Sequence, residues 1–164
     1  MAVLGISANS RIIGTAILEK DILLDYGVRL LKHRWSFRKA DKIIAHIATL
    51  IDDYGIMSIA LTIPYAHYES KETQALIGRI RTFCRTKKIH VSSYHPKTLH
   101  AFCPQAKAKK KGLMECLVTL YPELRASHSK ELRNKRERYH KLFEAVAAAT
   151  LHVRGLDGKK HASL

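Results

Sequence analysis

The segment between Gly55 and Pro64 constrains the fold more than any other part of the sequence. It contains the short run MSIALTI, at residues 57–63, which has the length of one strand and carries no charge. A strand of this kind is typical of a sheet that is covered on both faces, and such sheets are usually parallel. The preceding residues 37–54 have apolar side chains at helical spacing, with Ser36 as N-cap and Gly55 as C-cap. We therefore predict a helix that crosses over between two parallel strands.

Three strands are predicted before this helix, and a second helix and a further strand after it. The apolar residues of segments 3–6, 12–18 and 22–31 have strand character and are expected to form an antiparallel meander. The second helix begins after Ser70, and residues 89–93 form the fifth strand. Right-handed crossovers place strands four and five parallel to strand one. We predict an α/β fold with a mixed five-stranded sheet, three antiparallel strands first and two parallel strands after, flanked by helices.

The last third of the sequence is helical in character. A basic segment at residues 106–112 interrupts it, and a helix over residues 113–121 ends at Pro122. One long final helix is predicted over residues 129–152. Its first half is charged and its second half is alanine-rich, so we expect the first half to project from the core.

Length and composition indicate one intracellular domain. The chain has 164 residues, of which 46% are hydrophobic, and we assign residues 1–153 to one domain and 154–164 to a mobile tail. No apolar run of about 18 residues and no signal-peptide pattern is found, so we expect a cytoplasmic protein without a membrane partner. Cys84, Cys103 and Cys116 are odd in number and form no CxxC motif. We predict three reduced thiols that pack as small hydrophobic side chains.

Charge predicts a nucleic-acid partner. The chain has 29 Lys and Arg residues against 14 Asp and Glu residues, and its net charge is +15. Residues 107–141 alone contain eleven Lys or Arg residues and four glutamates. Basic side chains that meet phosphates release counterions, which gives salt-sensitive and largely sequence-independent binding. The side chains expected to contact nucleic acid are Arg11, Lys97, Lys107, Lys109, Lys110, Lys111, Lys130, Arg133, Arg136 and Lys141.

The opening segment GISANSRIIGTAIL, at residues 5–18, resembles the start of the RuvC-like Holliday-junction resolvases, which belong to the RNase H-like superfamily and open with a Gly-Ile-Asp-Pro-Gly-Ser type of segment. Residues 59–67, 91–102 and 143–152 resemble, in order, the fourth strand, the fifth strand with its following helix, and the alanine-rich last helix of that family. The resemblance implies an RNase H-like fold and a homodimer that presents basic faces to a four-way DNA junction. It also implies a two-metal nuclease site built from four acidic or histidine side chains.

Three of the four positions that the resemblance assigns to metal ligands carry other residues. Ser7 stands in place of the aspartate on strand one, and Pro64 ends the Thr-Ile-Pro sequence where a glutamate is expected at the end of strand four. Lys141 occupies the third position, and Glu144 alone keeps a carboxylate. A hydroxyl is neutral and an ammonium group is positive, so neither replaces the negative charge of a carboxylate as ligand of a hard divalent cation. We therefore expect no metal or other cofactor, and we predict a catalytically inactive protein that binds structured or branched DNA.

Two alternatives remain open at the level of sequence. One is an active junction endonuclease that holds Mg²⁺ or Mn²⁺ on divergent ligands, namely His140 and Glu144, which share a helix face four residues apart. Glu69, in the loop after strand four, is a third candidate ligand for such a site. The other alternative is a basic scaffold whose partner is RNA or protein, and it predicts no preference for branched over linear DNA.

Overall fold

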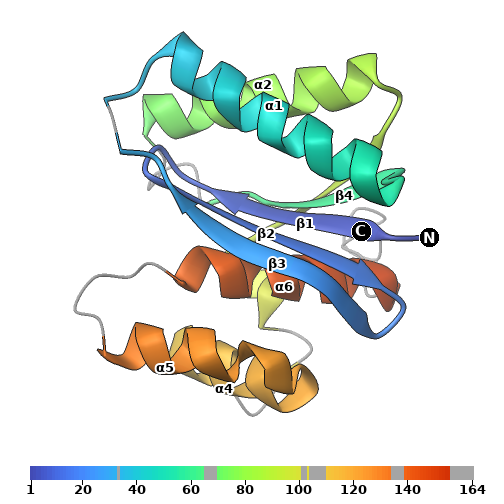
Figure 1. Cartoon of the computed structure of the whole chain (residues 1–164), viewed down its shortest axis with the longest axis vertical. Helices are drawn as coiled ribbons and strands as arrows, with labels where there is room; N and C mark the ends of the chain where they lie inside the picture. The colour runs from blue at the N-terminus through green and yellow to red at the C-terminus, as the bar shows by residue number, and fades with distance from the viewer. Residues whose placement is uncertain (33, 65–69, 101–102, 104–109, 134–138, 156–164) are drawn as a thin grey trace.

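A computed structural model of the chain shows one five-stranded sheet with helices on both faces (Figure 1). The structure describes residues 1–164 except 33, 65–69, 101–102, 104–109, 134–138 and 156–164. From residue 156 onward, the predicted mobile tail lies outside the described residues.

The sheet has the predicted mixed topology. Its strands are β1 (Val3–Ala8), β2 (Ile12–Glu19), β3 (Ile22–Leu30), β4 (Ser58–Thr62) and β5 (His90–Tyr94), in the order β3-β2-β1-β4-β5. The first three strands are antiparallel to one another, and β4 and β5 run parallel to β1. Parallel pairing brings the carboxyl ends of β1 and β4 to the same edge, where Ile6 is the register partner of Leu61.

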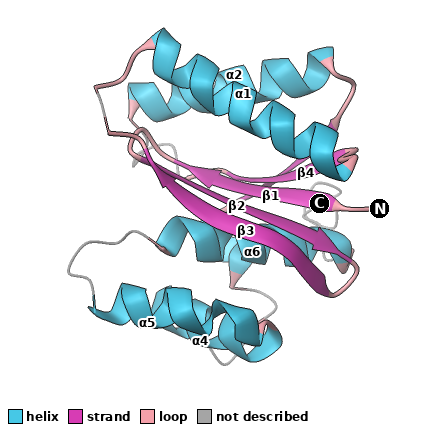
Figure 2. Cartoon of the chain, in the orientation of Figure 1, coloured by secondary structure: helices cyan, strands magenta, loops and turns pink. Residues whose placement is uncertain are grey.

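Helices α1 (Phe37–Tyr54) and α2 (Lys71–Thr86) cover one face of the sheet (Figure 2). The Ser36 hydroxyl accepts the Lys39 backbone N–H at 3.1 Å, and Gly55 ends α1 with a left-handed φ of 61°. Both caps are the predicted ones, because each depends on a local backbone preference.

The other face is covered by α6 (His140–Val153), which rests directly on the sheet. Gly5 of β1 and Gly14 of β2 permit this approach, because a Cβ at Gly5 would collide with the Ala145 carbonyl and one at Gly14 with the Lys141 backbone. Farther out lie α3 (Pro96–Leu99), α4 (Lys110–Leu120), the 3₁₀ turn η3 (Pro122–Leu124) and α5 (Arg125–Arg133). Among the described residues, no helix is both long enough and apolar enough to cross a membrane.

The prediction of one long helix over residues 129–152 is wrong. The structure has two helices there, α5 and α6, separated by residues that are not described. Glu131 of α5 is only 8% exposed, and its carboxylate accepts the backbone N–H of Tyr139, the N-cap of α6, at 2.8 Å. The described residues of the charged half that belong to α5 therefore do not project from the core: α5 packs on α4, and Glu131 accepts a backbone N–H at the start of α6.

The prediction of three reduced cysteines is also wrong for two of them. Cys103 and Cys116 form a disulfide that joins the segment after α3 to α4, with their Cα atoms 6.5 Å apart. Such a separation is common for bonded cysteines, but it arises from tertiary packing that spacing alone does not reveal. Cys84 is the buried free thiol, and burial raises its pKa to about 11. It packs as the small hydrophobic residue that was predicted.

Candidate active site and nucleic-acid interface

Four polar side chains meet where the end of β1 lies under the first turn of α6. They are Ser7, His140, Lys141 and Glu144, and we call them the α6 cluster. The Oε1 atom of Glu144 is 3.0 Å from Lys141 Nζ and 3.4 Å from His140 Nε2. The Ser7 hydroxyl donates to the same oxygen at 3.4 Å. The structure thus brings together three of the four positions that the sequence resemblance singled out, with His140 beside them.

The α6 cluster is largely shielded from solvent. Glu144 is 5% exposed and Ser7 is 1% exposed, and the side chains of Lys141 and His140 are 19% and 14% exposed. A carboxylate at this depth is strongly destabilising unless a positive charge and hydrogen-bond donors surround it. Lys141 supplies that charge from one turn away on the same helix. The one carboxylate of the cluster is therefore neutralised by the chain's own ammonium group.

Thr62 is the β4 residue that stands beside Ser7. Leu61 pairs with Ile6 in the parallel register, so Thr62 follows at the level of Ser7, and side-chain alternation places it on the same face as Ala60, which packs under α6. Its hydroxyl is buried and has no hydrogen-bond partner among the described residues. Pro64, the residue proposed from the resemblance, lies two residues past the end of β4. The end of β4 therefore places a neutral hydroxyl level with Ser7.

His100, the C-cap of α3, also faces the cluster and was not predicted as a site residue. Burial lowers its pKa, and the nearby Glu144 carboxylate opposes that shift. Its Nδ1 atom is buried without a hydrogen-bond partner in the described structure. Buried polar atoms that lack a partner are uncommon in proteins, and their explanations include a catalytic role and a bound water molecule or ion.

The α6 cluster contains few side chains that could bind a metal ion. Across the described residues, no group of three or more His, Cys, Asp or Glu side chains is arranged to hold a metal ion. The pair His140 and Glu144, proposed for a divergent nuclease, does come together, but Lys141 contacts the same carboxylate oxygen. Glu69, the third candidate ligand, lies outside the described residues.

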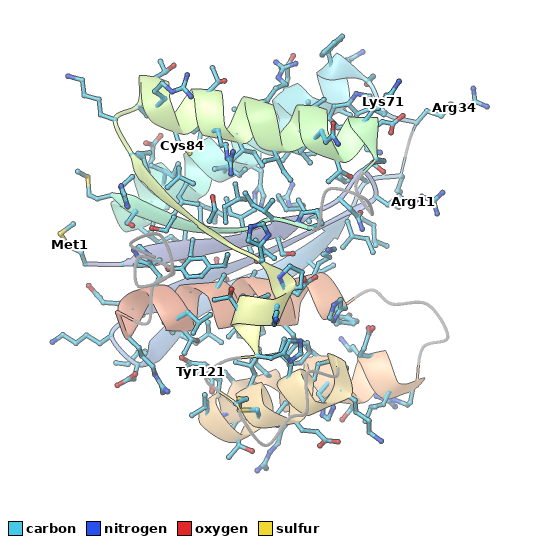
Figure 3. All side chains as sticks on the ribbon, turned by 180° about the vertical axis from the view of Figure 1, so that it is seen from behind. Met1, Arg11, Arg34, Lys71, Cys84 and Tyr121 are labelled. Carbon is cyan, nitrogen blue, oxygen red and sulfur yellow. A yellow bond between two sulfur atoms is a disulfide. The ribbon has the colours of Figure 1, made fainter. Side chains whose placement is uncertain are left out.

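Several of the predicted nucleic-acid contacts are exposed side chains. Those that the structure describes as exposed are Arg11, Lys97, Lys111, Lys130 and Arg133. Lys107, Lys109 and Arg136 lie outside the described residues, and Lys110 is described only as the first residue of α4. Figure 3 shows Arg11, Arg34 and Lys71 projecting from one end of the molecule, away from Met1. This is the end at which β1 stops and α6 begins.

A basic hollow on the α1 side of the sheet was missed by the sequence analysis, and we call it the α1 hollow. Its volume is about 740 Å³, and its lining residues are Ile13, Arg29, Leu30, Leu31, Lys32, Ser36, Arg38, Lys39, Lys42, Ile43 and His46. The lining contains five Lys or Arg residues and no acidic residue. Burial and the neighbouring Arg29 lower the pKa of His46, although Asp25 opposes them. Three separate segments build this hollow, so no local sequence pattern predicts it.

No protein-family model and no curated protein matches the chain. Among solved structures, the fold is similar to that of RuvC from Thermus thermophilus in complex with a Holliday junction substrate, with a TM-score of 0.71, 17% identity and 97% of each chain covered. A second structure of Thermus thermophilus RuvC has a TM-score of 0.68 and 16% identity, and the match covers 95% of this chain and 96% of that one. At such identities the likeness concerns the fold. It confirms the predicted RNase H-like sheet with its flanking helices.

Proposed function

We propose that this protein binds branched or structured DNA and does not cleave it by a two-metal mechanism. The observation that carries the proposal is the 3.0 Å contact between Lys141 Nζ and Glu144 Oε1 inside a RuvC-like fold. Two-metal hydrolysis depends on cations that activate water and stabilise the leaving oxygen, and those cations need carboxylate oxygens. Here the Lys141 ammonium group already contacts Glu144 Oε1, and Ser7 offers a hydroxyl in place of a second acid.

Charge and fold support the DNA-binding half of the proposal. Exposed cations such as Arg11, Arg34 and Lys71 project from the end of the molecule that also contains the α6 cluster. The similar Thermus structure contains a Holliday junction. A chain with a net charge of +15 attracts polyanions. Binding of this kind weakens steeply as salt rises, because counterions compete for the phosphates.

The test is a binding and cleavage assay on a synthetic four-way junction, a linear duplex and a single strand, at several salt concentrations, with and without Mg²⁺ or Mn²⁺. We expect the junction to be bound more tightly than the duplex, with a steep salt dependence and no cleavage. Absence of binding even at low salt would refute the proposal, and equal affinity for branched and linear DNA would favour a scaffold role.

A second candidate function is supported by the 3.4 Å approach of His140 to Glu144. A histidine and a carboxylate four residues apart could hold one metal ion once Lys141 moved away. This active-nuclease candidate predicts Mg²⁺- or Mn²⁺-dependent junction cleavage that Glu144→Ala abolishes. If the protein does not cleave DNA, as we propose, Ser7→Asp alone is expected to produce no cleavage, because Thr62 and Lys141 still provide no carboxylate.

A further inference from the structure

The α1 hollow combines an apolar floor with a cationic rim. Ile13 and Ile43 are buried side chains of the core between α1 and the sheet, and Leu31 packs beside them. Concave apolar surface next to charged groups strengthens the electrostatic attraction of those groups for a ligand, because it excludes water. The hollow is also large enough for a nucleotide-sized group.

Three cations that line the hollow have no acidic partner among the residues that the structure describes. Arg29, Arg38 and Lys42 are exposed, and no carboxylate forms an ion pair with them in the described part of the structure. Lys39 has a different role, because its ammonium donates to the carbonyls of Ser10 at 2.9 Å and Leu31 at 3.1 Å. It ties the β1–β2 turn to the end of β3. The other cations are thus available to an anion from outside.

An exposed aromatic ring lies at the N-terminal end of α1, at the residue between Ser36 and Arg38, which both line the hollow. Phe37, the first residue of the helix, is 71% exposed, and the Arg79 guanidinium lies 5.6 Å from the centre of its ring. Asp41, one turn along α1, forms an ion pair with Arg79 and so fixes that guanidinium. A large exposed phenylalanine that is backed by a fixed cation is a suitable platform for stacking a nucleic-acid base.

The hollow and the α6 cluster lie at one end of the sheet, on opposite faces. Ala8, the last residue of β1, pairs with Ile13, which in turn pairs with Arg29 at the end of β3. The β1–β2 turn that contains Arg11 joins the two faces. A strand of nucleic acid that leaves the α6 side can therefore continue over this turn toward α1.

We propose that the α1 hollow binds an unpaired strand of the DNA, with phosphates held by Arg29, Arg38 and Lys42 and a base stacked on Phe37. The proposal rests on the proposed DNA-binding function and specifies its substrate as branched DNA with a single-stranded segment. Fully base-paired arms carry the same phosphate charge, but their bases are already stacked inside the duplex. The aromatic platform therefore distinguishes single-stranded from double-stranded arms.

The experiment compares affinities by fluorescence anisotropy for an oligothymidylate, a fully paired four-way junction and the same junction with a single-stranded flap. The variants are Phe37→Ala and the double substitution R38A/K42A. The matched control is R85A/K87A, which removes the same charge from exposed positions at the C-terminal end of α2. Thermal unfolding of each variant shows that it is folded.

We expect both α1 variants to weaken binding of the oligothymidylate and the flapped junction by about tenfold, and to change binding of the fully paired junction by less than about threefold. The control should weaken all three DNAs equally and slightly. Equal losses on paired and unpaired DNA, or no loss at all, would overturn the inference while leaving junction binding in place. Tight binding of oligouridylate without binding of oligothymidylate would overturn the assignment to DNA. A wild-type protein that binds the oligothymidylate but no junction would instead contradict the proposed function.

Discussion

At one end of the sheet, charged side chains are compensated within the protein on one face and not on the other. On the α6 face, a carboxylate that is 5% exposed is matched by an ammonium group at 3.0 Å, and the polar groups face one another. On the α1 face, exposed cations line a hollow without any carboxylate among its lining residues. Buried charge must be compensated inside the protein, whereas exposed charge in a hollow can be compensated by a ligand. The comparison separates the cluster at the positions that the sequence resemblance assigns to metal ligands from the surface that we assign to binding.

The largest expected effect tests the direct packing of α6 on the sheet. Gly14→Ala would place a Cβ against the Lys141 backbone, so α6 must move, and we expect a loss of about 3 kcal/mol or more in the free energy of unfolding. Gly27→Ala in β3 is the control, because a Cβ there meets nothing within 4 Å. Urea denaturation measures both. Equal effects of the two substitutions would contradict direct packing of α6 on β2.

The second prediction concerns the charge pair on the α6 face. Lys141→Met leaves the buried Glu144 carboxylate without its ammonium partner, and we expect a loss of about 3 kcal/mol in stability. Adding Glu144→Gln to the Lys141→Met variant should recover much of that loss, because the buried carboxylate charge is then removed. A double-mutant cycle by urea denaturation measures the coupling. Strictly additive single effects would mean that the contact contributes nothing to stability.

The third prediction concerns the helical layer outside α6. The Cys103–Cys116 disulfide joins cysteines with a sequence separation of 13, and its reduction is expected to cost up to about 3 kcal/mol in the free energy of unfolding. Under denaturing conditions without reductant, thiol titration should find one reactive group, Cys84, and after reduction it should find three. Three reactive thiols before reduction would contradict the bridge.

The smallest expected effect is a pH dependence shared by both faces. Burial is the main cause that lowers the pKa of His46 in the α1 hollow and of His100 beside the α6 cluster, so the unfolded chain takes up protons more readily than the folded chain. Stability should therefore fall as the pH drops below the ordinary histidine pKa of about 6.5. His46→Gln and His100→Gln should each flatten the profile in denaturation curves measured between mildly acidic and neutral pH. A profile unchanged by both substitutions would show that other groups cause the dependence.

Local signals predicted most of the fold. The caps at Ser36 and Gly55 and the short run that became β4 were readable because each depends on nearby residues. The break between α5 and α6 was not readable, because it involves the buried Glu131 carboxylate and the backbone of Tyr139. Tertiary packing likewise decided the cysteine pairing.

The candidate site was predictable only in part. Ser7, Lys141 and Glu144 came from the resemblance and do meet in the structure. Thr62 required the register between β1 and β4, since the position on strand four depends on which residue faces α6. The α1 hollow required the tertiary structure, because β2, β3 and α1 contribute to it from separate segments.

The most direct test of the central claim is the thermal unfolding of the wild-type protein at increasing Mn²⁺ concentration. A ligand that binds the folded state raises its melting temperature by mass action. If Lys141 takes the place of a metal on Glu144, the melting temperature of the wild-type protein should not change with Mn²⁺. A rise in melting temperature that Glu144→Gln abolishes would show that the cluster still binds a metal, and it would contradict this account.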